Sequence, residues 1–401
     1  MRSANRPYMY TVDHLRAGAA ILVLLYHATR NVTERMDPAL TAQSAQAWMY
    51  SKNPAVTVIL EGHTGVALFM VLSGFIFTVG TNGEEVRYWP YLHNRLLRIY
   101  PLYAAILVVG LSASPTELNL KTLALAVFPI GNLSTLSELG WWGAMFWAVA
   151  VEVQFYLVFP FLLRFLNRRG PLTLVKIICA MLVLRSLAVL SQPGAIDINH
   201  MTYSSLAGRL DQFILGMLAA WAFTNHRRVF SSLTLALSAV AAVAMMWVFN
   251  QTHWFADPQA SRVIWVDIEG LIWATFIASY VAVFERFRGR ATRLLAKLGE
   301  TSYSIYLLHV VVIGWIVAHP GMWIHVGGSV TSGFATGALV VLPLTVVVAF
   351  FTYNGIEKPF LSMRGTYRKQ IDTPEDSSTE DGGTSRRGRR ADVLAERLPV
   401  P

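Results

Sequence analysis

An arginine and a histidine, Arg16 and His27, stand eleven residues apart in one apolar stretch near the N-terminus, TVDHLRAGAAILVLLYHATRN. On an α-helix this spacing puts both side chains on one face, about 16 Å apart along the axis. An imidazole is suited to general-base chemistry, and a guanidinium to holding an anionic carrier or a developing negative charge. The alternatives are a snorkelling flank residue for Arg16 and a helix-packing hydrogen bond for His27.

Two further arginines, Arg95 and Arg98, stand before the third apolar segment in HNRLLRIYPLY. An i, i+3 pair faces one side of a helix, and two guanidinium groups there suit phosphate or a nucleotide-like ligand. Ser73 in VLSGF is grouped with them as a candidate donor-binding residue. Ordinary positive charge flanking a membrane segment is the alternative interpretation of the arginines.

A carboxylate, Glu152, lies in the apolar sequence FWAVAVEVQFYLVFP, at a predicted depth similar to that of His27. A carboxylate in lipid is protonated or paired. A pair with His27 would orient the imidazole for proton transfer, and a structural pair with Arg185 is the alternative. A structural role is favoured for the remaining polar insertions, which are Arg209, Asp211, Asp267, Glu269, His309, Glu357 and Lys358.

The elements that must position these residues are membrane helices. The chain is 54% hydrophobic and 14% charged, against about 25% charged residues in a typical soluble domain. A helix needs about 20 mostly apolar residues to cross a bilayer. Ten segments qualify: 12–31, 56–80, 99–113, 143–163, 172–192, 205–224, 231–249, 262–284, 302–319 and 331–354. The predicted fold is an all-α polytopic transmembrane bundle of about ten spans.

Lys and Arg concentrate in alternate loops, which predicts that both termini are cytoplasmic. The net charge of +9 follows from this distribution, so nucleic-acid binding is not expected. The segment 119–133 is interpreted as a re-entrant or interfacial piece, with an eleventh span as the alternative. Residues 1–360 are predicted to form the membrane domain, and residues 361–401 a disordered cytoplasmic tail. With Cys179 as the single cysteine, no cysteine-based metal site is expected.

Seven blocks of this sequence together resemble the acyltransferase-3 family of membrane proteins, over about 350 residues. They are Arg16 to His27, GVALFMVLSGF (65–75), RLLRIYPLY (95–103), VEVQFYLVFP (151–160), GRLDQFILGM (208–217), LGETSYSIYLLHV (298–310) and IEKPF (356–360). The chain departs from the family pattern at Ala67, Met70 and Val153, which bears on the acceptor site more than on the reaction class.

The resemblance implies about ten spans and acyl transfer from a cytoplasmic acyl-CoA, commonly acetyl-CoA. The acceptors it implies are hydroxyls of surface glycans, lipid-linked sugars, nodulation signals, glucans or macrolide sugars. The family's essential histidine and arginine fall on His27 and Arg16, its paired arginines on Arg95 and Arg98, and its mid-membrane glutamate on Glu152.

The resulting hypothesis is a multi-pass O-acyltransferase of the cell inner (cytoplasmic) membrane that uses acyl-CoA and no metal. His27 acts as general base, Glu152 orients it, and Arg16 holds the donor or stabilises developing charge. Arg95 and Arg98 hold the phosphates of the carrier. The acceptor is a saccharide, a lipid-linked glycan or a macrolide, and membrane lipid surrounds the protein. A covalent acyl-histidine intermediate is the competing mechanism, and a transporter or exporter of a saccharide or lipid-linked precursor is the competing function.

Overall fold

The structure of the chain is a computed structural model. It describes residues 8–38, 49–81, 83–113, 123–124, 127–128, 132, 140–191, 196–253, 260–287 and 289–367. Most of the predicted re-entrant segment 119–133, and the tail beyond residue 367, lie outside the described residues. The chain divides into two units, residues 1–369 and residues 370–401, and only the first is described below.

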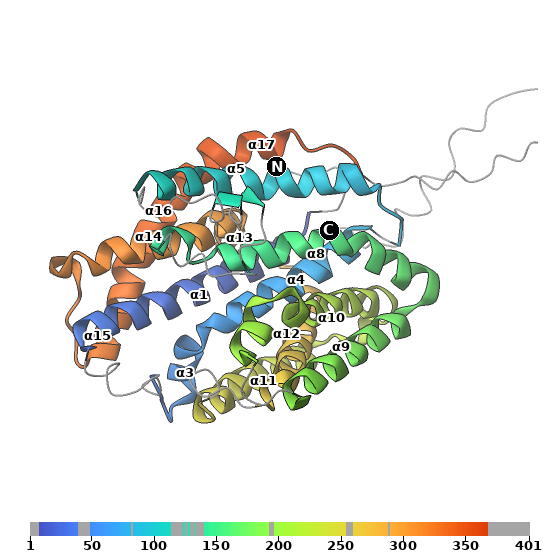
Figure 1. Cartoon of the computed structure of the whole chain (residues 1–401), viewed down its shortest axis with the longest axis horizontal. Coiled ribbons are helices and arrows are strands. Elements are labelled where there is room, and N and C mark those ends of the chain that lie inside the picture. Colours follow the sequence, from blue (N-terminus) through green and yellow to red (C-terminus); the bar gives the residue numbers. More distant parts are fainter. Residues whose placement is uncertain are drawn as a thin grey trace, which may run out of the picture. The chain divides into compact units, whose positions relative to one another are not determined.

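The described part is all-helical (Figure 1). Short helical turns link α3 to α4, and π-helical turns join α15, α16 and α17 into one run. The helices are α1 (Tyr10–Met36), α3 (Pro54–Leu60), α4 (Gly65–Thr81), α5 (Tyr88–Ala113), α7 (Gly140–Gly143), α8 (Phe146–Arg169), α9 (Pro171–Ser191), α10 (Leu206–Asn225), α11 (Ser232–Gln251), α12 (Arg262–Phe284), α13 (Arg290–Glu300), α14 (Ser302–Val317), α15 (Ser329–Thr336), α16 (Leu342–Thr352) and α17 (Lys358–Ser362).

The ten apolar segments predicted from the sequence fall on helices in the described residues, but 56–80, predicted as one span, is divided at Glu61 between α3 and α4. Seven helices are long and apolar enough to cross a membrane, or eight if the bent pair α13 and α14 counts as one span. Helices α1 and α10 are not among them. Both carry charged residues, such as Arg16 and Arg209, which lower their hydropathy. The multi-pass helical character is therefore confirmed, while the count of ten spans and the cytoplasmic placement of the termini stay predictions.

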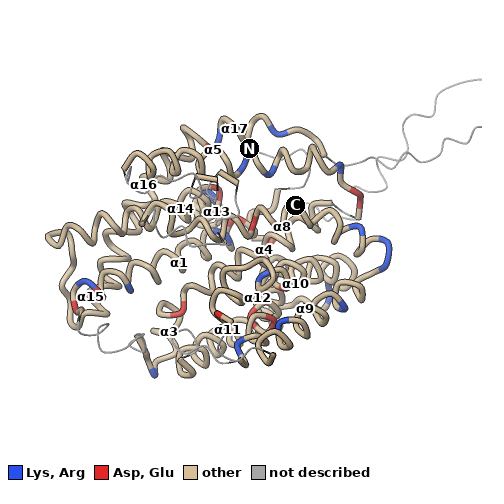
Figure 2. Tube along the Cα trace, in the orientation of Figure 1, with Lys and Arg blue, Asp and Glu red and all other residues tan. Residues whose placement is uncertain are grey.

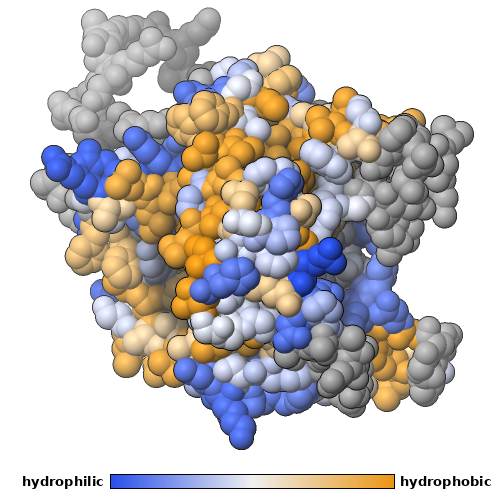
Figure 3. Space-filling view, turned by 90° about the vertical axis from the view of Figure 1, so that its left-hand side faces the viewer, coloured by the Kyte–Doolittle hydropathy of each residue, from blue (hydrophilic) through white to orange (hydrophobic). Residues whose placement is uncertain are grey.

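Broad apolar areas reach the surface of the molecule, including the face drawn in Figure 3. On α9 the side chains of Leu184 and Leu190 are 66% and 70% exposed, and on α11 Leu233 and Val240 are each 68% exposed. The Lys and Arg residues, in contrast, lie mainly at helix ends and in loops (Figure 2). In water such apolar faces would be costly, so they are the lipid-facing surface of the bundle.

Close helix contacts depend on glycine where α4 crosses α10. A Cβ atom on Gly74 would lie 2.0 Å from the carbonyl oxygen of Phe213, and one on Gly216 would lie 2.0 Å from that of Val71. Small residues are favoured at such crossings because they let backbones approach. The contact fixes α4, which carries Ser73, against α10, which carries Arg209.

Helix α1 runs without a break from Tyr10 to Met36 and packs against α4, α13, α14 and α15. Its continuity preserves the predicted relation of Arg16 and His27, three turns apart on one face. Helix α5 differs from the prediction because it begins at Tyr88 rather than near residue 99, and it contains Pro101. Arg95 and Arg98 therefore lie within α5, as their i, i+3 spacing requires if they share one helix face.

Candidate active site

A cavity between α1, α4, α5, α8 and α14 gathers five of the six predicted site residues, Arg16, Ser73, Arg95, Arg98 and Glu152. It encloses about 60 Å³, within an empty space of about 770 Å³ that includes its mouth. The sequence predicted the members of this group from separate segments, and the fold brings them to one place. His27 is not among the residues that line this cavity.

The Arg95 guanidinium is held by aromatic rings rather than by a carboxylate. Its central carbon lies 4.5 Å from the ring centroid of Phe77, 5.3 Å from that of Tyr91 and 5.6 Å from that of Tyr367. Its Nη2 donates to the Tyr367 hydroxyl at 3.2 Å, and its Nε has no partner among the described residues. A buried guanidinium held this way keeps its positive charge available to an anion.

The residues after α17, which were predicted to belong to the tail, pack against α5 close to the arginines of this cavity. Asn94 on α5 donates to the Gly365 carbonyl at 2.7 Å, and Tyr367 is only 3% exposed. Burial, followed by the nearby charges of Arg98, Arg95 and Arg16, lowers the pKa of Arg364 to about 10. Arg364 therefore stays cationic at neutral pH and adds a fourth guanidinium to the group.

Glu152 forms its bonds within the arginine-lined cavity. The Tyr156 hydroxyl donates to Glu152 Oε1 at 2.5 Å, and the Ser73 hydroxyl lies 3.4 Å from the same oxygen. The alternative partner Arg185 is engaged elsewhere, because its Nη2 bonds to Asp211 and lies 3.0 Å from Asp267. The predicted pair of Glu152 with His27 is not formed, so in this geometry Glu152 does not orient the imidazole.

The partner of His27 is a second histidine, His309 on α14. His27 Nδ1 lies 3.2 Å from His309 Nε2 and 3.0 Å from the carbonyl oxygen of Val23. His309 is fully buried, and its Nδ1 lies 2.6 Å from the carbonyl oxygen of Tyr306. The signal for His309 in the sequence is a histidine within an apolar segment, for which the sequence favours a structural role.

The hydrogen-bond pattern assigns the tautomers of the neutral pair. A carbonyl oxygen only accepts, so the proton of His309 is on Nδ1, and its Nε2 carries a lone pair. That lone pair and the Val23 carbonyl both face His27 Nδ1, which therefore carries the proton of His27. The lone pair of His27 is consequently on Nε2, which forms no hydrogen bond within the described residues. This is the arrangement of an oriented base with one nitrogen open.

Tyr306 connects the histidine pair to the arginine-lined cavity. It lines that cavity, and its ring centroid lies 5.9 Å from that of His309. The guanidinium groups of the cavity and the imidazole of His27 thus lie at different depths of the bundle, with Tyr306 between the cavity and the histidine pair.

Among the described residues, no group of three or more His, Cys, Asp or Glu side chains is arranged to hold a metal ion. The charged groups of the cavity are instead suited to an organic anion. Arg16 is paired with Asp13 at 3.0 Å, whereas Arg95 and Arg98 have no ion pair within the described part of the chain. The excess of guanidinium groups over carboxylates at this mouth favours a ligand with several negative charges.

Together the fold and the site define a polytopic helical membrane protein with a buried histidine pair next to a cavity lined by three arginines. The model of an acyltransferase domain matches residues 9–354, and the chain belongs to this acyltransferase family. The resemblance based on the seven sequence blocks is thereby confirmed.

Curated relatives cover most of the chain. It is 24% identical to the peptidoglycan O-acetyltransferase OatA of Listeria monocytogenes over 393 residues, which cover 88% of this chain and 56% of the relative. It is 24% identical to the O-acetyltransferase OatA of Staphylococcus aureus over 386 residues, covering 88% of this chain and 57% of the relative. The chain thus spans less than two thirds of the length of these relatives. No solved structure matches it.

Proposed function

We propose that the chain is a membrane-bound O-acyltransferase that moves an acyl group, most simply acetyl, from acyl-CoA to a hydroxyl of a saccharide. The observation that carries the proposal is the histidine pair with an open Nε2, set beside a cavity lined by three arginines. The names of the relatives, which are O-acetyltransferases, support the same reaction class.

The proposed reaction begins with His27 Nε2 accepting the proton of the acceptor hydroxyl. The hydroxyl oxygen attacks the thioester carbonyl carbon, the carbon–sulfur bond breaks, and the thiolate of CoA takes the proton back from His27. His309 accepts the hydrogen bond of His27 Nδ1 and so stabilises the imidazolium formed on the way. A second positive charge 3.2 Å from the first is unfavourable, so His309 stays neutral during this step.

In this proposal the arginine-lined cavity binds the donor. Arg16, Arg95 and Arg98 face the phosphate end of CoA, and Arg364 adds positive charge close to them. Arg16 is about 16 Å below His27 along α1 at 1.5 Å per residue, which suits the arm that separates the phosphates of CoA from its thioester. Glu152, bonded to Ser73 and Tyr156, belongs to the donor cavity rather than to the base.

The reaction is proposed to take place in the cytoplasmic membrane, with the arginine mouth on the cytoplasmic side where acyl-CoA is made. Peptidoglycan is the first acceptor to test because one relative is named for it.

Membranes from cells that overproduce the chain should transfer radiolabel from acetyl-CoA to added peptidoglycan, and mild alkali should release the label as expected for an ester. Membranes without the protein are the control. Counterflow of a saccharide with no transfer of label would contradict the proposal and favour a transporter.

A further inference from the structure

A second cavity lies beyond the histidine pair, and the proposed chemistry does not use its charged side chains. Its lining includes Glu61, His63, Arg209, Arg262 and Glu269, each no more than 7% exposed. Burying ionisable groups in a membrane protein is costly, and such groups generally mark a path or a binding site. The cavity encloses about 20 Å³, within an empty space of about 400 Å³ that includes its mouth.

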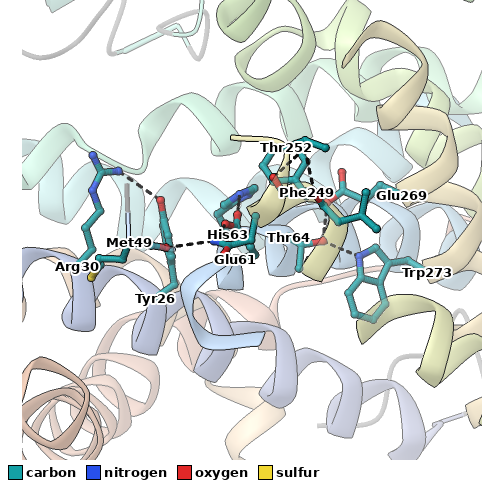
Figure 4. Close-up of polar contacts among 12 residues, drawn as sticks. Tyr26, Arg30, Met49, Glu61, His63, Thr64, Phe249, Thr252, Glu269 and Trp273 are labelled. Carbon is teal, nitrogen blue, oxygen red and sulfur yellow. Dashed lines mark hydrogen bonds and ion pairs between the residues drawn. The ribbon is translucent and has the colours of Figure 1, made fainter. Parts of the chain in front are cut away.

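The polar groups of this second cavity form an organised set (Figure 4). His63 Nε2 lies 2.9 Å from Glu61 Oε2, and Asn250 donates to Glu61 Oε1 at 2.7 Å. On the other side, Arg209 lies 3.5 Å from Glu269, whose second oxygen accepts from Thr64 at 2.5 Å. Both carboxylates of the wall are therefore paired with hydrogen-bond donors.

The charge of this cavity differs from that of the donor cavity. Two carboxylates, Glu61 and Glu269, balance two guanidinium groups, Arg209 and Arg262, so an anion gains little there. A neutral ligand with many hydroxyl groups, each both a donor and an acceptor, fits such a wall. Aromatic side chains also line it, namely Tyr203, Phe249 and Trp265, and sugar rings commonly stack their C–H faces on such rings.

The second cavity lies close to the reacting imidazole. The ring centroid of Tyr26 lies 5.4 Å from that of His63 and 4.8 Å from that of His27, its neighbour in the chain. Tyr26 is ten residues from Arg16, which places this cavity about 15 Å along α1 from the level of the donor arginines. The histidine pair thus stands between an anion-binding cavity and a neutral one.

We infer that the cavity lined by Glu61, His63, Tyr203, Arg209, Arg262 and Trp265 binds the acceptor, a neutral saccharide, and presents one of its hydroxyl groups to His27. This inference rests on the proposed function. The enclosed space of about 20 Å³ suffices for one small polar group, since a single water molecule needs roughly 10–15 Å³ by the same measure. The ring of the saccharide then occupies the wider mouth.

The inference is tested by binding, independently of catalysis. The full chain in lipid nanodiscs is dialysed to equilibrium against tritiated chitotetraose, a neutral tetramer of N-acetylglucosamine, and separately against radiolabelled acetyl-CoA. Arg262→Gln removes a charged donor, and Trp265→Leu removes an aromatic ring while keeping an apolar side chain. Arg168→Gln, at an exposed ion pair with Glu85, and Trp315→Leu, at a half-exposed position on α14, are the matched controls.

The expected result is a saccharide Kd about tenfold higher in both cavity variants, which corresponds to a loss of about 1.4 kcal/mol of binding free energy in each. Acetyl-CoA binding should be unchanged in them, and both controls should match the wild type. An unchanged saccharide Kd in the cavity variants, an equal loss of both ligands, or no saccharide binding by the wild type at millimolar concentration would each overturn the inference. Saccharide that binds as expected but never receives label from acetyl-CoA would instead overturn the proposed function and leave this site standing.

Discussion

Replacing His309 tests whether the second histidine positions the base. His27 Nδ1 has two acceptors, the Val23 carbonyl at 3.0 Å and His309 Nε2 at 3.2 Å. His309→Ala removes one of them and leaves the other, so the tautomer of His27 survives. A neutral hydrogen bond contributes about 1 kcal/mol, and the imidazolium depends on it more strongly. We therefore expect kcat to fall about 10- to 100-fold, with little change in the KM for acetyl-CoA.

The conservative variant separates positioning from packing. In His309→Gln the side-chain oxygen accepts a hydrogen bond from His27 Nδ1 and fills most of the space, so kcat should recover part of the loss. His319→Ala is the matched control, because His319 Nδ1 also bonds to a backbone carbonyl, that of Trp315 at 2.7 Å, but it is exposed. Steady-state kinetics with radiolabelled acetyl-CoA in nanodiscs gives both constants. A His309→Ala enzyme with wild-type kcat would refute the reasoning, as would a Gln variant no better than Ala.

Three further predictions concern the donor cavity and the helix packing. Arg95→Ala and Arg98→Ala should each raise the KM for acetyl-CoA about tenfold, since a hydrogen bond to a charged group contributes about 1.5–3 kcal/mol. An unchanged KM would show that the two arginines do not bind the donor and would favour the alternative, positive charge that flanks a membrane segment. Arg364→Gln should raise the same KM several-fold and weaken its dependence on salt, whereas the exposed Arg168→Gln should leave both unaffected. Gly74→Ala should lower the thermal stability of the protein in detergent, because the added Cβ would lie 2.0 Å from the Phe213 carbonyl oxygen. Gly18→Ala is the control, because a Cβ there meets open space. Equal melting temperatures for the two variants would contradict the packing argument.

Local patterns in the sequence are sufficient to predict the helices and the chemical types at the site. Apolar runs of about 20 residues indicate membrane segments wherever lipid is the solvent, and the described residues of the ten segments are mainly helical, although 56–80 is divided between α3 and α4. Arg16 and His27 keep their predicted relation because α1 is one unbroken helix. Charged residues explain why α1 and α10 are less apolar than the seven helices that are long and apolar enough to cross a membrane.

The partners of the site residues could not be predicted, because they come from distant parts of the chain. His27 and His309 are 282 residues apart, and Arg95 and Tyr367 are 272 apart. Depth along a helix had suggested a pair of Glu152 with His27, but depth does not specify which helix faces which. Tyr367 and Arg364 were assigned to a polar tail since no apolar periodicity marks their segment, although hydrogen bonds to α5 hold it in place.

The most direct test of the account is acetyl transfer by wild-type protein and His27→Asn, measured side by side in the same lipid preparation together with acetyl-CoA binding. We predict equal donor binding, because His27 does not line the arginine cavity. Transfer should fall by at least about 100-fold in the variant, as expected for loss of a general base. Transfer at the wild-type rate by His27→Asn, with donor binding intact, would contradict the assignment of His27 as the base.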